Sequence, residues 1–154
     1  MKRMQRTIAI GVALGVALGA RAARAALGEP EASIAADREA LAANSRGTTA
    51  HAAYTVHEME RGGTAIREYV SPSGVVFAIA WNGLANPDLA PLLSSYAEEY
   101  REAAKQALHP RGRRSQRIAS AHMVVDRWGH MRDLHGLAYA PALVPSGVAV
   151  DELR

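Results

Sequence analysis

Two glycine-containing turns in the middle of the chain constrain its fold more than any other feature. The first, Arg61-Gly62-Gly63-Thr64, has paired glycines, which accept the positive φ of a two-residue hairpin turn. The second, Ser71-Pro72-Ser73-Gly74, has proline in second position and glycine in fourth, which is typical of a type I turn followed by a glycine bulge. The two turns therefore predict three consecutive antiparallel strands.

The residues around these turns also predict the register of the strands. The first hairpin brings opposite charges and apolar groups together in the pairs Glu58–Arg67, Met59–Ile66 and Val56–Tyr69. The second pairs Tyr69 with Phe77 and Val70 with Val76. Residues 75–81 are apolar throughout, so we expect a central strand that is covered on both faces. A helix is expected on the face with the smaller side chains, which are Val76, Ala78 and Ala80.

Helix signals flank this strand unit. Residues 33–43 predict a short helix with Ser33 as N-cap, and the polar residues 44–49 end it. A long helix is predicted over residues 88–108, capped by Asp88 and ended by Pro110. Residues 118–126 and 130–139 predict a second strand pair. We expect an α+β fold, an antiparallel sheet of about five strands packed against one long helix, with a short N-terminal helix (α-β-β-β-α-β-β).

The first 25 residues have the three zones of a signal peptide. A basic start is followed by an apolar stretch over residues 7–20 and then by small residues, with Ala23 and Ala25 at the −3 and −1 positions. We predict cleavage between Ala25 and Ala26, with cleavage after Ala22 as the alternative. Fourteen residues rise only about 21 Å as a helix, too little for a ~30 Å hydrocarbon core, so no stable membrane anchor is expected after cleavage. The mature domain, residues 26–154, is predicted to be periplasmic or secreted.

Cysteine content and charge narrow the function classes. The chain has no cysteine, which excludes disulfides, thiolate metal sites, cysteine nucleophiles and a lipid anchor on cysteine. Residues 1–25 hold five of the 18 basic residues and no acidic residue, so the mature part has 13 basic and 15 acidic side chains. This balance of −2 gives no reason to expect a nucleic-acid partner.

Three stretches of the chain are distinctive, namely AAYTVHEM at 52–59, REYVSPSGVVFAIAWNG at 67–83 and MRDLHGLAYAPALVPSGV at 131–148. They resemble a family of small exported bacterial proteins known only as a domain of unknown function. The resemblance extends over nearly the whole mature chain and implies a bacterial exported protein. It implies no activity, cofactor or catalytic residue.

Four aromatic residues form the first candidate site. In the predicted register Tyr54, Tyr69, Phe77 and Trp81 share one face of the sheet, which would suit a peptide, glycan or apolar ligand if it were open. We expect instead that the N-terminal helix or the C-terminal loop packs on this face, because 129 residues leave few elements without a packing role.

Two further groups could carry chemistry. His57 and Glu68 oppose each other in the first hairpin. We expect a structural cross-strand pair, with a general base oriented by the carboxylate as the alternative. His122 and His135 would face each other as metal ligands if Trp128-Gly129 formed a two-residue turn. A type I turn over residues 126–129 is expected instead, and it sets His122 opposite Leu134.

Four arginines cluster in the loop before the second strand pair, namely Arg111, Arg113, Arg114 and Arg117. A solvated loop is expected, with polyanion binding as the alternative. Taken together, the sequence favours a non-enzymatic exported module that binds an unknown protein or ligand of the cell envelope, without cofactor or metal. The alternatives are a small metal-binding periplasmic protein and a hydrolase-like enzyme that uses His57 and Glu68.

Overall fold

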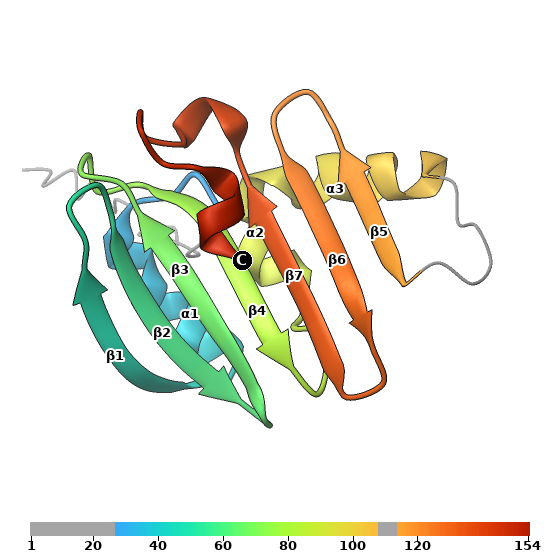
Figure 1. Ribbon diagram of the computed structural model, residues 1–154, viewed down its shortest axis with the longest axis horizontal. Helices are drawn as coiled ribbons and strands as arrows, with labels where there is room; N and C mark the ends of the chain where they lie inside the picture. Colours follow the sequence, from blue (N-terminus) through green and yellow to red (C-terminus); the bar gives the residue numbers. More distant parts are fainter. Residues whose placement is uncertain (1–26, 108–113) are drawn as a thin grey trace, which may run out of the picture.

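The computed structural model describes residues 27–107 and 114–154 and contains one seven-stranded antiparallel sheet (Figure 1). Its strands are β1 (Asn44–Ala50), β2 (Thr55–Arg61), β3 (Thr64–Val70), β4 (Val76–Gly83), β5 (Ser115–Ala119), β6 (Val124–His130) and β7 (Asp133–Tyr139). The helices are α1 (Ile34–Ala40), α2 (Leu89–Leu93) and α3 (Ala97–Gln106), with short 3₁₀ turns at Glu31–Ser33, Ser94–Tyr96, Pro141–Leu143 and Val150–Leu153. No helix in the described part of the chain is long and apolar enough to span a membrane.

The sheet consists of two meanders joined side by side. Its strand order is β1-β2-β3-β4-β7-β6-β5, so the first four strands follow one another and the last three return toward β4. The central contact is the antiparallel pairing of β4 with β7, from Ala78 opposite Tyr139 to Gly83 opposite Leu134. The two outer strands are β1 and β5.

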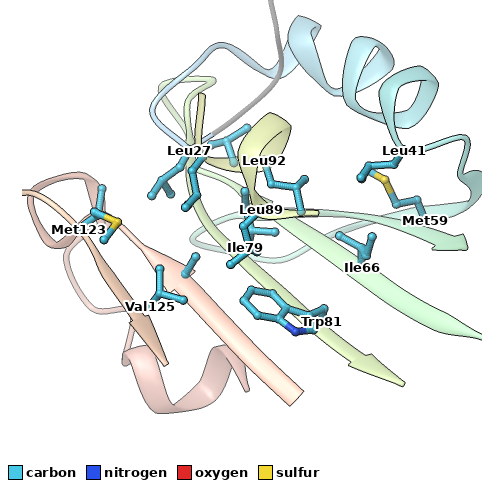
Figure 2. Close-up of a cluster of buried hydrophobic side chains, with 14 of the residues drawn as sticks. Leu27, Leu41, Met59, Ile66, Ile79, Trp81, Leu89, Leu92, Met123 and Val125 are labelled. Atoms are coloured by element: carbon cyan, nitrogen blue, oxygen red, sulfur yellow. The ribbon is translucent and has the colours of Figure 1, made fainter. Parts of the chain in front are cut away.

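The helices cover one face of the sheet, behind it in Figure 1. Leucines of α2 and the loop residue Leu41 pack there on apolar side chains from six strands, β2 to β7, and Figure 2 shows Ile79 near the centre of this cluster, with Trp81 beside it. The remaining buried strand residues of this layer are Met59, Ile66, Val70, Val76, Ile118, Val125 and Ala138. This layer is the larger of the two hydrophobic cores.

The C-terminal segment, residues 140–154, covers part of the opposite face and lies in front of the sheet in Figure 1. Leu153 is fully buried there, and its carbonyl accepts a hydrogen bond of 3.1 Å from the Tyr69 hydroxyl. Val144, Val148 and Val150 add partly buried contacts. The C-terminal segment, which has little sequence periodicity, thus covers the second hydrophobic core.

The fold class expected from the sequence is wrong. The sheet has seven strands instead of about five, and the protein is mostly β, with short helices in place of one long helix. Residues 44–50, expected to be a break followed by the first strand, form β1 with every residue exposed, because an edge strand need not carry an apolar face. The predicted strand at 118–126 is divided by a turn into β5 and β6.

The predicted helix over 88–108 is also interrupted. Asp88 caps α2 through a 2.9 Å bond from the Ala90 amide, as expected, but α2 ends at Leu93. Ser94 has φ 39°, which breaks the helical path before α3 begins. The break lets the leucines of α2 pack on the sheet centre while α3 crosses toward β5. The expected end before Pro110 lies outside the described residues.

The register of the first hairpin is as predicted, and that of the second is correct only at its start. Glu58–Arg67, Met59–Ile66, Val56–Tyr69 and Val70–Val76 are all observed pairs. Tyr69 then pairs with Ala78 instead of Phe77, because a bulge lies at this point. Phe77 and Ala78 both belong to the core under the C-terminal segment, whereas Ile79 and Trp81 face the helices.

The bulge places Trp81 against β7. Gly136 is its cross-strand partner, and a Cβ at Gly136 would overlap the six-membered ring of Trp81. We expect Gly136→Ala to lower the free energy of unfolding by about 2 kcal/mol through overpacking. Gly47→Ala, on β1 with no atom near its ideal Cβ, is the matched control and should change it by less than about 0.5 kcal/mol. Urea unfolding followed by circular dichroism measures both, and equal effects would contradict the proposed close contact.

Candidate functional site

A groove lies between α1 and the strands β1 and β2 on the helix-covered side of the sheet. It has a volume of about 560 Å³. Its lining combines polar, charged and apolar residues, namely Glu31, Ala32, Ile34, Ala35, Arg38, Ser45, Gly47, Thr48, His57, Glu58 and Met59. This size and mixture are typical of a small-ligand or peptide site.

His57 stands in this groove with both ring nitrogens bonded. Its Nε2 lies 2.7 Å from Glu31 Oε1, and its Nδ1 lies 3.1 Å from the Thr48 hydroxyl. Its side chain is 21% exposed, so the imidazole is held in one orientation while part of it still faces solvent. The three residues come from three separate elements, and the imidazole links them.

Backbone bonds fix the position of Glu31. The Glu31 amide donates to Gly74 O at 2.9 Å, and Pro30 forms an isolated bridge with Val75. The segment before α1 is thereby attached to the Ser71–Gly74 turn that the sequence predicted. Glu31 then projects from the first 3₁₀ turn toward β2, where it meets His57.

A buried pair of carboxyl groups, Asp37 of α1 and Glu68 of β3, lies under the helix. Asp37 is 1% exposed and Glu68 is fully buried. None of their four oxygens has a hydrogen-bond donor from any other described residue. The pair is therefore satisfied only if one carboxyl is protonated and donates to the other.

Burial is the main cause of the pKa shifts in this pair. The pKa of Asp37 is raised to about 9, mainly by burial, with smaller contributions from the nearby charge of Glu68 and a hydrogen bond with Glu68. Burial also raises the pKa of Glu68 to about 7, although the hydrogen bond from Asp37 partly opposes this. Both shifts favour the protonated forms, so the pair retains at least one proton at neutral pH.

The predicted His57–Glu68 pair occurs in the backbone register but not between the side chains. The two residues are direct partners across β2 and β3. Glu68, however, is buried beside Asp37 under α1, and His57 bonds to Glu31 and Thr48. The imidazole and carboxylate are thus directed to different partners.

The aromatic residues are divided between the two faces of the sheet. Tyr54, Tyr69 and Phe77 form an edge-on cluster with ring centroids 5.6 to 6.2 Å apart. The C-terminal segment packs on this cluster, and Tyr69 and Phe77 are buried. Trp81 lies on the helix side, where its indole N–H donates to Asn86 Oδ1 at 2.9 Å. The β3–β4 bulge accounts for this separation.

The histidines considered as metal ligands lie apart. His122 sits in the turn between β5 and β6 and contacts Glu99, with its Nδ1 3.2 Å from Oε1. His135 pairs with Trp128, stacks on its ring and bonds to Asp133. The register expected for this hairpin, with His122 opposite Leu134, is wrong, because the turn lies at residues 131–132. In residues 27–107 and 114–154, no group of three or more suitable side chains could hold a metal ion.

Sequence reasoning missed the role of Asp37. A signal was present, since Ile34, Asp37 and Leu41 follow the three- and four-residue spacing of a buried helix stripe. A carboxyl group on such a stripe needs a partner, but the sequence does not indicate that this partner is Glu68, 31 residues away. That proximity depends on how α1 crosses the sheet.

The chain matches the family model described as "Protein of unknown function (DUF2844)" over residues 23–153. The chain belongs to this family. Membership of DUF2844 confirms the expected domain of unknown function and assigns no activity to it. No curated protein and no solved structure matches the chain.

The buried pair makes the stability of this DUF2844 protein depend on pH. In the unfolded chain the two carboxyls titrate near 3.8 and 4.5, whereas both pKa values are raised in the folded state. Between about pH 5 and 9 the folded state binds more protons, so the free energy of unfolding falls as pH rises. We expect the free energy of unfolding, measured in urea, to be lower at pH 9 than at pH 5 by more than about 1.4 kcal/mol, the equivalent of one pKa unit.

Asp37→Asn is the diagnostic variant, because it removes one of the two titrations. The pH dependence should become clearly shallower in Asp37→Asn and remain unchanged in Glu98→Gln, which alters an exposed carboxylate on α3. A wild-type stability that is constant or rises over this range would contradict a shared proton.

Proposed function

We propose that this protein is an exported, non-enzymatic binding module of the bacterial cell envelope that takes up an extended peptide segment of a partner protein. The proposed site is the outer edge of β1 together with the groove beside it. The observation that carries the proposal is this combination of a strand edge that no described residue pairs with and a groove in which His57 is held by Glu31 and Thr48.

The outer edge of β1 supports peptide binding. In the described part of the chain, β1 pairs only with β2, and all seven of its residues are exposed. Extended peptides add to such edges through main-chain hydrogen bonds. The irregularity between Ser45 and Gly47 limits regular pairing to the second half of the strand, from Gly47 to Ala50.

The groove supplies contacts for side chains of the same peptide. Glu31 and Arg38 offer opposite charges, and Ile34 and Met59 offer apolar surface. A short peptide carries groups of all these kinds, so it can use the groove and the strand edge together.

The bonding of His57 favours recognition over catalysis. With both ring nitrogens bonded to protein groups, His57 has no nitrogen free for a bound water or ligand, and the one group that it could activate is the Thr48 hydroxyl on the exposed edge strand β1. Glu68, its proposed orienting carboxylate, is buried beneath α1. His57 is thus suited to shaping the wall of the groove.

Export is supported by the sequence of residues 1–25 and by the position of Leu27. Leu27 is fully buried, and its amide donates to Leu92 O at 3.0 Å, so cleavage beyond it would remove a core residue. The family match begins at residue 23, close to the predicted cleavage site.

Filling the groove should abolish peptide binding. Ala35 is an exposed groove residue of α1, and Ala35→Trp introduces a bulky ring there. A peptide selected on the purified protein from a random display library should bind Ala35→Trp at least about tenfold more weakly in calorimetry. Hydrogen exchange should also show new protection of the β1 amides in the wild-type complex.

Ala40→Trp is the matched control, because Ala40 is an exposed alanine of the same helix outside the groove. It should bind the selected peptide like the wild type. Failure to select any peptide, or equal affinity in both tryptophan variants, would contradict the proposed site.

Export gives a second, independent measurement. When the full chain is produced in a Gram-negative bacterium, mass spectrometry of the periplasmic fraction should find a mature protein that starts at Ala26. Ala25→Gln, which alters the −1 position, should lead to accumulation of the uncleaved precursor. A wild-type protein that keeps Met1 and stays in the cytoplasm would refute export.

A further inference from the structure

A second hollow lies at the opposite end of the sheet from the groove. Its volume is about 270 Å³, and it is formed by the start of β5, the end of β6, the loop after β4 and the start of β7. Its lining residues are Asn86, Arg114, Ser115, Gln116, Arg127, Trp128, Gly129 and Leu134. Two of them are arginines, and none is acidic.

Both amide side chains in this hollow have their oxygen atoms engaged. Gln116 Oε1 accepts a 2.5 Å bond from Arg127, and Asn86 Oδ1 accepts a 2.9 Å bond from the indole of Trp81. These bonds set the orientation of each amide, since the opposite assignment would bring donor against donor. Each amide therefore has its NH₂ group left to donate.

The NH₂ group of Gln116 has an additional property. Its nitrogen is buried and has no hydrogen-bond partner among the described residues. A buried donor without an acceptor is unfavourable, and an acceptor in the hollow would remove this penalty.

The two arginines also lack a counter-charge. In the described ranges, neither Arg114 nor Arg127 forms an ion pair with a carboxylate, in contrast to Arg117 and Arg154, which both contact Asp126 on the other face. The backbone holds the two arginines near each other, because the Gly129 amide donates to Arg114 O at 3.1 Å and Gln116 pairs with Arg127 across β5 and β6.

We propose that this hollow, between Asn86, Arg114, Gln116 and Arg127, binds a phosphate group. Guanidinium groups bind phosphate through charge-assisted and often paired hydrogen bonds. The two amide NH₂ groups and the Ser115 hydroxyl supply further donors around a tetrahedral oxyanion. The phosphate belongs either to a free anion or to a lipid headgroup, and both present the same oxygens.

This site is independent of the peptide site at β1. The two occupy opposite edges of the sheet, and no residue lines both. One part of the arginine cluster seen in the sequence, Arg114, contributes to the hollow. Arg117 faces Asp126 instead, and Arg111 and Arg113 lie outside the described residues.

Titration with inorganic phosphate tests the proposal by nuclear magnetic resonance on the mature protein, at fixed pH and ionic strength. The side-chain amide signals of Gln116 and Asn86 and the backbone amide of Gly129 should shift together and saturate. Arg114→Gln should weaken binding by about tenfold. Arg114 is exposed, so this variant should keep the wild-type spectrum elsewhere.

Arg46→Gln is the matched control, because it removes one positive charge on β1, at the far edge of the sheet, and should bind phosphate like the wild type. Vesicles of phosphatidic acid and of phosphatidylcholine distinguish the two sources. Binding to phosphatidic acid vesicles that depends on Arg114 supports a lipid headgroup. Saturable binding of inorganic phosphate without binding to these vesicles supports a free anion. No saturable shift with either probe, or equal losses in Arg114→Gln and Arg46→Gln, would overturn the proposal.

Discussion

The pairing of β4 with β7 holds the two halves of this protein together. β4 ends the first meander and β7 ends the second, so every other strand depends on this contact for its place in the sheet. Trp81 lies across Gly136 at this junction, and its indole N–H holds Asn86 in the loop after β4. A single aromatic side chain thus connects the central strand pair, the helix-side core and the edge of the second hollow.

The two candidate sites lie at opposite edges because the centre of the sheet is closed on both faces. Helices cover one side and the C-terminal segment covers much of the other, so the aromatic cluster of Tyr54, Tyr69 and Phe77 lies in a core. Polar side chains accumulate instead where the layers end. At β1 they surround His57, and at β5 and β6 they include two arginines that have no counter-charge among residues 27–107 and 114–154. The buried Asp37–Glu68 pair is the exception, and its position makes the attachment of α1 sensitive to protonation.

Sequence reasoning recovered the parts of the fold that local chemistry controls. The Gly62-Gly63 turn set the register of β2 and β3 at every predicted pair, and Asp88 caps a helix as expected. The predictions were wrong where a single extra residue changes the face of the sheet on which the following side chains lie. The extra residue at the β3–β4 bulge moved Trp81 away from the other aromatics and separated the predicted site. Sequence reasoning also failed at β1, since an exposed edge strand carries no hydrophobic pattern to detect.

The sequence by itself determined the family, the hairpin turns and the residues able to carry charge or protons, because these depend on neighbours along the chain. Only the tertiary structure decided that Asp37 meets Glu68, that His57 meets Glu31 and that Arg127 meets Gln116 beside Asn86. Such contacts join segments far apart in the chain, and their formation depends on the strand order and on the path of α1. The physical reason is that the chemistry of a side chain depends on its residue type. Its burial and its contacts with residues far along the chain depend on how the sheet and helices pack.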